Sequence, residues 1–477
     1  MIGGGLAGMS CAVALAEAGL RVRLFEKKPH LGGRATSYTL PDGSEVDNCQ
    51  HLTLGCCTNL ADFYRRVGAE SKIRTYDRMY LVDRRGTCST FKSGILPPPL
   101  HMAGSMMFFR ALSQADKRGI ARALMTVARA GGSPAGIDGM SMLAWLERME
   151  QTSAAIARFW RVVLVSALDE ELDRAEARYG IDVFWKTFLA NRRGSLIGLP
   201  SVPLAELYEG CADSIARQGG EVKARSGVRE IIVRDGRFAG IAFEDGTETS
   251  ADACVAAVPF DVLPNLVPKA MAEPGGVLAG LQSLRTSPIT SVHLWYDRSV
   301  MEWPYLALLD HTVQWIFNKT ALYADCETNS GRVRQNEAKE GGQYLQLVIS
   351  ASYDLVRRPR PEIIDLCSRE LAEILPATAV AKLLKATVIK EVHATFSPAP
   401  GVDRLRPGQD SGVSNLFFAG DFTRTGWPST MEGAVRSGYL AAEFVLASFE
   451  APRKFLQPDL PPEGLSSWWS RRQGTAA

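Results

Sequence analysis

Long hydrophobic runs are absent from this sequence of 477 residues, apart from a glycine-containing apolar segment at the N-terminus. A helix that crosses a bilayer needs about 20 consecutive apolar residues, so we expect no membrane-spanning helix. An excess of one charge is also missing, because 54 Lys and Arg residues face 52 Asp and Glu residues, for a net charge of +2. Such a chain has no broad field that would attract nucleic acid. We therefore expect no nucleic-acid partner.

The nine cysteines show no spacing that is typical of a zinc site or a disulfide framework. The only adjacent pair, Cys56 and Cys57, is poorly suited to share a metal, because neighbouring side chains point apart. We therefore predict free thiols, no metal site, and a reducing, cytoplasmic location. The sequence also contains no internal repeat.

The length and the pattern of the chain predict more than one folding unit. Residues 95–204 lack the alternation of strands and are expected to be mostly helical. Between residues 221 and 259 the pattern turns to β, and the Asp-Gly turns at residues 235–236 and 245–246 predict a three-stranded meander. The segment beyond Pro452 is rich in Pro, Ser and Arg and is predicted to be a loose tail.

The N-terminus carries a glycine motif that is typical of dinucleotide binding. Gly3, Gly5 and Gly8 match G-x-G-x-x-G, a predicted helix follows them, and Glu26 ends the next predicted strand. The glycines permit a tight turn, a close approach of backbone N–H groups to a pyrophosphate, and close packing of helix on strand, while the acid accepts ribose hydroxyls. The alternative is a glycine-rich turn without a ligand. The contacts predicted from this segment are Gly3, Gly5, Leu6, Ala7, Gly8, Glu26 and Lys27.

Only Met1 and Ile2 precede the glycines, although a Rossmann unit begins with a strand at this position. We therefore expect a shortened first strand and weaker retention of a cofactor. This feature keeps a non-catalytic relative that binds no cofactor as an alternative from another class.

Two further glycine segments suit the same site. Gly32 and Gly33 with Arg34 are suited to a second approach to a diphosphate, although an ordinary surface turn fits them equally well. Near the other end, a predicted strand ends in Gly420 and Asp421 before a helix that starts at about residue 432. This arrangement places a carboxylate near sugar-like hydroxyls and a helix N-terminus near a ring that gains negative charge. Gly33, Arg34, Gly420, Asp421 and Met431 are the predicted contacts.

The sequence resembles the flavin amine oxidase and carotenoid desaturase superfamily, and within it the hydroxysqualene dehydroxylases. The resemblance extends to about residue 448, and Cys49 departs from it because a glycine is usual at that position. The residues that carry it, besides the glycine motifs, are Asp47-Asn48-Cys49-Gln50-His51, Gln314-Trp315-Ile316-Phe317, Ala394-Thr395-Phe396, Arg404-Leu405-Arg406-Pro407 and the segment from Thr425 to Ala434.

This resemblance implies an α/β fold with a Rossmann-type, glutathione-reductase-like FAD-binding domain and an inserted α+β substrate domain. FAD is the implied cofactor, with the backbone of Val228 beside the adenine. The expected FAD domain is discontinuous. It comprises residues 1–90, 205–285 and 405–450, with a substrate or cap domain at 91–204 and 286–404 and a loose tail at 451–477.

The resemblance also implies an activity, the reductive dehydroxylation of hydroxysqualene to squalene, as in hopanoid biosynthesis. A phytoene-type carotenoid desaturase, in which hydride moves in the opposite direction, is the alternative. An amine oxidase is less expected, because no tryptophan–tyrosine pair precedes Gly420. Gln50 and His51 are the candidate catalytic residues, although a structural role is the first expectation for His51. The sequence does not name the electron donor.

Residues 95–109 combine three consecutive prolines with Met106, Met107, Phe108 and Phe109. Such an apolar segment could dip into a bilayer from which an isoprenoid substrate enters, or it could form a buried helix entrance. The first interpretation predicts peripheral contact with the inner face of a membrane.

Overall fold

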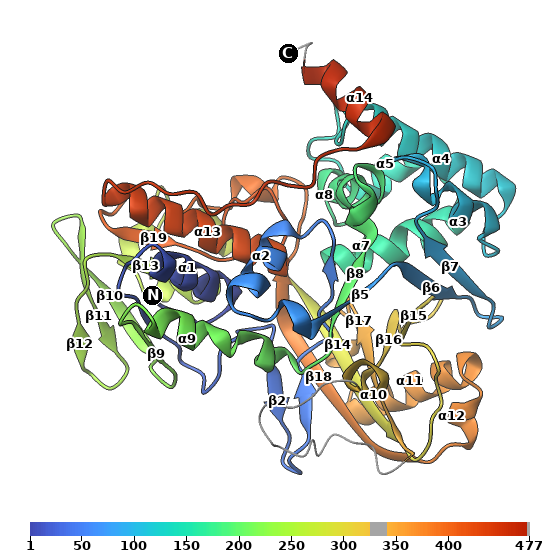
Figure 1. The fold of residues 1–477 in the computed structure, drawn as a ribbon, viewed down its shortest axis with the longest axis horizontal. Helices are drawn as coiled ribbons and strands as arrows, with labels where there is room; N and C mark the ends of the chain where they lie inside the picture. Colours follow the sequence, from blue (N-terminus) through green and yellow to red (C-terminus); the bar gives the residue numbers. More distant parts are fainter. Residues whose placement is uncertain (325–340, 475–477) are drawn as a thin grey trace.

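The computed structural model describes residues 1–324 and 341–474. Figure 1 shows two regions: one has parallel strands covered by the helices α1 (Leu6–Glu17) and α13 (Met431–Ser448), and the other combines a large sheet with a group of helices. The predicted α/β fold with an inserted α+β region is thereby confirmed. No helix in the described ranges is both long and apolar enough to cross a membrane.

A parallel sheet forms the centre of the first region. β1 (Arg23–Phe25) pairs with β9 (Glu221–Lys223), and β13 (Cys254–Ala256) pairs with β19 (Leu416–Phe418), both in parallel. Ile2 lies between the two pairs and bridges Phe25 on one side and Ala256 on the other. The expected short first strand is therefore present as one doubly paired residue, which joins the sheet halves through backbone hydrogen bonds.

Two helices pack against this sheet and against each other. α1 is buried along almost its whole length, which explains why its sequence is alanine-rich. Gly438 of α13 lies so close to α1 that an added Cβ would stand 2.1 Å from Ser10 Oγ and 2.3 Å from the Ala7 carbonyl oxygen. The glycine is required by this close approach. The other helices of this region are α2 (Thr58–Arg66) and α9 (Gly210–Ala216).

The predicted meander is confirmed as an antiparallel sheet of three strands. The predicted turns at residues 235–236 and 245–246 connect them, and the Phe25 and Phe243 rings meet edge to face, with centroids 4.9 Å apart. This contact fixes the meander beside β1. Its strands are β10 (Val228–Arg234), β11 (Arg237–Phe243) and β12 (Glu248–Thr249).

A seven-stranded sheet, ordered β18-β14-β17-β16-β15-β6-β7, forms the core of the second region. The sequence predicts a first cofactor segment that ends at residue 90, but β6 and β7 begin before that residue and belong to this sheet. The local pattern does not reveal this, because β6 pairs with the distant β15. The strands are β6 (Arg78–Val82), β7 (Cys88–Lys92), β14 (Thr286–Tyr296), β15 (Tyr305–Leu308), β16 (Trp315–Asn318), β17 (Gln343–Ile349) and β18 (Leu383–Phe396).

Helices cover the second region. Apolar side chains of α11 (Arg360–Ile374) pack on the large sheet beside α12 (Ala377–Val380). α10 (Lys319–Tyr323) contacts β16 and β17, and its Leu322 belongs to a different apolar cluster. The predicted helical character of residues 95–204 is confirmed, except for β8 (Ile197–Pro200), which pairs with β4 (Thr53–Leu54) and β5 (Ile73–Tyr76). β2 (Ser37–Thr39) pairs with β3 (Glu45–Asp47). The helices of that block are α3 (Ala103–Phe108), α4 (Gln114–Arg129), α5 (Met142–Arg148), α6 (Ser153–Ala155), α7 (Arg161–Leu168) and α8 (Ala177–Phe184).

The C-terminal segment differs from the predicted loose tail. Phe455 is buried, and its N–H donates to Glu443 Oε1 at 2.8 Å. Asp459 forms ion pairs with Lys186 and Arg436 at 2.6 and 2.9 Å. The segment then crosses to the helical block and ends in α14 (Gly464–Gly474) (Figure 1). Its composition suggests disorder, but a few anchoring side chains suffice to hold it.

The eight cysteines among the described residues carry free thiols. Most of them are buried, and Cys326, for which a free thiol is also predicted, lies outside the described residues.

The contact between α1 and α13 predicts that G438A destabilises the protein. The added methyl group has to displace the α1 backbone, and overpacking of this kind costs about 1–3 kcal/mol. The melting temperature, followed by circular dichroism, should fall. G104A is the matched control, because Gly104 lies in α3 and a Cβ added there would have no atom within 4 Å. Equal melting temperatures for the two variants would contradict the argument.

Candidate functional site

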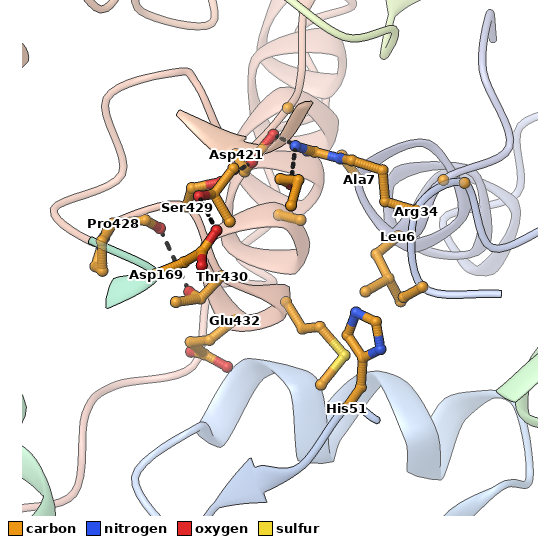
Figure 2. A pocket seen from close by; sticks show the side chains of 18 of the residues that line it. Leu6, Ala7, Arg34, His51, Asp169, Asp421, Pro428, Ser429, Thr430 and Glu432 are labelled. Atoms are coloured by element: carbon orange, nitrogen blue, oxygen red, sulfur yellow. Dashed lines mark hydrogen bonds and ion pairs between the residues drawn. The ribbon is translucent and has the colours of Figure 1, made fainter. Parts of the chain in front are cut away.

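One elongated cavity of about 790 Å³ runs between the two regions. It begins at the N-terminal glycine turn, passes the turn before α13, and ends against apolar side chains of the large sheet and of the helical block. Figure 2 shows side chains from both ends of the chain around it, with Leu6, Arg34 and Asp421 among those labelled. The cavity is therefore built from segments that lie far apart in the sequence.

The glycine turn gives the cavity an anion-binding end. Gly3 has φ +98°, and a Cβ there would stand 2.4 Å from the Ala257 carbonyl oxygen. Gly5 is the N-cap of α1 and supplies no side chain, so the first N–H groups of the helix lack a side-chain cap. A Cβ on Gly5 would meet only Gly33, at 3.9 Å. The open side of this turn is suited to a phosphate group.

Gly8 lies behind the turn and does not line the cavity. A Cβ at Gly8 would be 1.9 Å from the carbonyl oxygen of Gly3. The third glycine therefore permits close packing of α1 on the strand, as its position in the motif predicts, and it acts on a ligand only through the shape of the turn.

Glu26 holds the glycine turn from the side. Its Oε2 accepts the N–H of Gly4 at 2.6 Å, and its Oε1 accepts the N–H of Lys28 at 2.7 Å. A carboxylate can accept about four hydrogen bonds, so lone pairs remain for hydroxyl groups of a ligand in the cavity. Glu26 thus positions the backbone and offers acceptors at the same time.

The second glycine segment lies directly on the first. Gly33 has φ +63°, and its Cβ position is 3.1 Å from Gly5 Cα. Arg34, which follows it, forms an ion pair of 2.6 Å with Asp421 and donates to the Ala394 carbonyl oxygen at 2.7 Å. Ser429 donates to the other oxygen of Asp421. Figure 2 shows this connection between the two ends of the chain.

The structure brings together nearly all the residues that the sequence predicts to contact a cofactor. Gly8 is the exception. The predicted residues that line the cavity are Gly3, Gly5, Leu6, Ala7, Glu26, Lys27, Gly33, Arg34, Val228, Gly420, Asp421 and Met431, together with Gln50 and His51.

The candidate catalytic residues Gln50 and His51 lie over a buried ion pair. Lys319 Nζ is 2.7 Å from both Asp47 Oδ2 and Gln50 Oε1, and the Lys319 and Asp47 side chains are fully buried. Burial lowers the pKa of Lys319. Burial opposes the ionisation of Asp47 as well, but the charge of Lys319 and the hydrogen bonds from Lys319, Leu204 and Ser37 together hold the pKa of Asp47 below its usual value. The amide of Gln50 is thereby engaged, and its Nε2 donates to the His51 carbonyl oxygen at 3.1 Å.

His51 faces the cavity with one ring nitrogen committed. Its Nδ1 lies 2.9 Å from the Cys49 carbonyl oxygen, and the N–H is the donor. Burial lowers the pKa of His51, so the ring is neutral near pH 7. A neutral imidazole can orient a ligand through Nε2 but is a poor proton donor. The catalytic roles of Gln50 and His51 stay predictions.

The far end of the cavity is apolar. The Trp315 and Phe317 rings of β16 lie nearly parallel, with centroids 5.9 Å apart, and the Trp315 N–H donates to Ser166 at 2.7 Å. Because that polar group is already paired, the wall offers few polar handles to a ligand. Other apolar side chains of this wall are Val163, Val183, Phe188, Ile289 and Val348.

The sequence-based prediction misses several ionisable residues of the site, among them Lys319 and Asp169. Lys319 contacts Asp47 and Gln50 across more than half of the chain, and no local pattern announces such a pair. Asp169 also lines the cavity, where it ends α7 in a left-handed conformation with φ 51°. An acid at the end of an apolar helix was the available signal for Asp169.

The fold and the cavity define an oxidoreductase with a dinucleotide cofactor. The sequence matches the family of flavin containing amine oxidoreductases over residues 6–446, and the chain belongs to this family. Its cofactor is FAD, and the alternative of a relative without a cofactor is not supported. The glycine turn, the uncapped start of α1 and Glu26 fit the dinucleotide part of FAD.

Known relatives include desaturases of carotenoid precursors. The chain is 25% identical over 464 residues to 15-cis-phytoene desaturase of Synechococcus elongatus, which covers 93% of this chain and 95% of the relative. It is 27% identical over 475 residues to zeta-carotene desaturase of Arabidopsis thaliana, covering 93% and 84% of the two chains.

Solved structures share the fold. An oxidoreductase from Methanosarcina mazei has a TM-score of 0.70 at 18% identity, over 92% of this chain and 97% of the other. Putrescine oxidase bound to putrescine has a TM-score of 0.66 at 14% identity, over 94% and 98% of the two chains.

The geometry of the glycine turn predicts that E26A weakens FAD binding. The substitution removes the acceptor for the Gly4 N–H and any acceptor for ribose hydroxyls. Because a hydrogen bond to a charged group contributes about 1.5–3 kcal/mol, the dissociation constant should rise at least about tenfold. Fluorescence titration of the apoprotein with FAD measures it. E17Q, at the other end of α1 and outside the cavity, should bind FAD like the wild type; equal affinities of all three proteins would exclude this role of Glu26.

Proposed function

We propose that the protein oxidises a long acyclic isoprenoid, in a desaturation like that of the carotenoid desaturases among its relatives. The observation that supports this most directly is the apolar end of the cavity. Burial of apolar surface is the main source of affinity for a hydrocarbon chain, at about 25 cal/mol per Å². A wall whose few polar groups are mostly paired is suited to such a chain.

The proposed contacts of FAD follow the length of the cavity. In this proposal the N-terminal glycine turn and α1 hold the diphosphate, Glu26 binds ribose, and the backbone of Val228 lies beside the adenine. Gly420, Asp421 and the turn to Met431 hold the other half of the cofactor. Lys27 contributes least, because its side chain is exposed and pairs with Glu244 at 2.7 Å.

Bound FAD supplies the two-electron chemistry by accepting or returning a hydride. The protein excludes water and orients the substrate. Trp315 and Phe317 provide flat apolar surfaces for a polyene, and the buried Lys319–Asp47 pair keeps Gln50 and His51 in place. A rigid apolar wall beside the cofactor would hold the reacting carbons in position.

The second candidate is the reductive dehydroxylation of hydroxysqualene. The sequence resemblance at residues 47–51 and 425–434 favours it, and the cavity brings both segments together. The same apolar wall suits both substrates. The two reactions differ in the direction of hydride transfer.

The proposed desaturation predicts that oxidised holoenzyme loses its oxidised-flavin absorbance when it is mixed with phytoene under anaerobic conditions. At the same time, the absorbance of a product with a longer conjugated polyene should appear. Putrescine is the control amine and should leave the flavin oxidised. Conversion of hydroxysqualene to squalene by reduced enzyme, with phytoene untouched, would replace the first candidate by the second. Reduction by putrescine would contradict both.

The protein also has an exposed apolar surface that suits a membrane. Ile95 is 97% exposed, Phe108 75% and Met107 61%. Arg192 donates to the carbonyl oxygens of Gly94 and Leu96, so the tip is held in a fixed shape. None of residues 95–109 lines the cavity, so this segment does not form a wall of the substrate site. The membrane interpretation depends on the exposed surface alone, and Lys92, Arg110 and Arg118 are exposed nearby.

We therefore expect I95D/F108D to lose binding to vesicles that contain anionic lipids. Burial of one such side chain contributes about 1.5–3 kcal/mol, so the double variant should bind at least about 100-fold more weakly in a cosedimentation assay. V380D is the matched control, because Val380 is also 75% exposed but belongs to α12. Equal loss in V380D, or no binding by the wild type, would reject this membrane contact.

A further inference from the structure

Asp169 is a buried carboxyl group in the wall of the cavity. It is 4% exposed and follows the last residue of α7, where its N–H donates to the Val165 carbonyl oxygen at 2.9 Å. Its left-handed backbone, with φ 51°, turns the chain at the end of the helix. Figure 2 draws and labels it among the side chains that line the pocket.

Neutral donors, rather than a cation, surround this carboxyl group. Oδ1 accepts the Ala351 N–H at 2.7 Å, and Oδ2 lies 3.0 Å from the Thr395 hydroxyl. Within residues 1–324 and 341–474, no Lys, Arg or His forms an ion pair with Asp169. A buried carboxylate without a cation is costly, so the site favours the neutral acid.

The titratable groups around Asp169 also favour its neutral form. Burial raises its pKa well above the usual value, and the negative charge of Glu170 adds to this, whereas the bonds from Ala351 and Thr395 oppose it. Glu170 is itself paired with Arg174 and accepts the Tyr353 hydroxyl. Cys49 faces Asp169 from the 47–51 segment, and burial raises the pKa of its thiol, which is therefore neutral.

We propose that Asp169 is a catalytic residue, the group that exchanges a proton with the substrate. The inference rests on the proposed function. It is drawn from three features: the carboxyl group reaches the cavity, it has no cationic partner among the described residues, and a backbone N–H and a hydroxyl fix its orientation. His51 is a weaker candidate for the proton donor of a dehydroxylation, because its single N–H is committed to the Cys49 carbonyl oxygen.

The proposed step is balanced in atoms and electrons. In desaturation, two neighbouring carbons each lose a hydrogen; one leaves as hydride with two electrons, which bound FAD accepts. The other leaves as a proton and forms an O–H bond with the Asp169 carboxylate, while the electron pair of its C–H bond becomes the new double bond. In dehydroxylation the same group, starting neutral, would give its proton to the departing hydroxyl group, which would leave as water. The carbon that loses the hydroxyl group would then receive a hydride from reduced FAD.

This role predicts a particular pH dependence of turnover. In desaturation Asp169 has to be ionised, so kcat/KM should rise with pH through a pKa above the ordinary range of a carboxyl group, about 3.9. D169N should lower kcat by about 100-fold or more with little change in KM, since acid–base catalysis contributes about 10²–10⁴-fold. In D169N, the rise of kcat/KM with pH (the limb of the pH profile) should be absent.

Two further variants should move the limb in opposite directions. E170Q removes a negative charge that raises the pKa of Asp169, so its limb should lie at lower pH. T395V removes a hydroxyl that stabilises the carboxylate, so its limb should lie at higher pH. These shifts keep the test decisive if D169N does not fold, and flavin absorbance and thermal unfolding report whether it does.

Infrared spectroscopy tests the group without turnover. The wild-type holoenzyme should show the carbonyl stretch of a neutral carboxylic acid on the acid side of the kinetic limb, and this band should titrate with the limb and be missing in D169N. An unchanged band in D169N, or an unchanged kinetic limb in D169N together with active wild type, rejects the role of Asp169 alone. Absence of any turnover of phytoene or hydroxysqualene by the wild type rejects the proposed function and this inference with it.

Discussion

The ion pair between Arg34 and Asp421 joins segments that lie 387 residues apart. Asp421 is nearly buried while Arg34 is partly exposed, so the pair is screened less than one on the open surface. Arg34 also binds the end of β18 through the Ala394 carbonyl oxygen, and Asp421 accepts Ser429 from the turn before α13. Arg34 and its partners therefore fix the distances between three walls of the cavity: the second glycine segment, the end of β18 and the turn before α13.

The first half of the site was predictable because its constraints are local. The tight turn requires Gly3, and the close packing of α1 requires Gly8. An acid is needed beside the turn, at the end of the next strand. Each requirement therefore fixes a residue type at a fixed spacing in the sequence. The meander was predictable for the same reason, since its Asp-Gly turns and alternating strands are short-range features. The C-terminal half followed from a strand that ends in Gly420 and Asp421.

The rest depends on contacts that no local pattern encodes. The partner of Asp47 is Lys319, far along the chain, and nothing in the composition of either segment announces the pair. β6 joins the large sheet through β15, so the region boundary cannot be located from residues 78–92 alone. The tail resembles a disordered segment in composition, yet Phe455 and Asp459 find partners on α13 and on the helical block.

The position of Ile2 between Phe25 and Ala256 has a consequence for the order in which the protein can be assembled in a cell. Ribosomes release the N-terminus first, but the strand that completes the sheet next to β13 is β19, and Asp421 follows it. The glycine turn must therefore wait, with its sheet incomplete, until nearly the whole chain has been synthesised. FAD can meet a complete pocket only at the end of translation or after it, so a supply of cofactor cannot protect the early folding intermediates from aggregation.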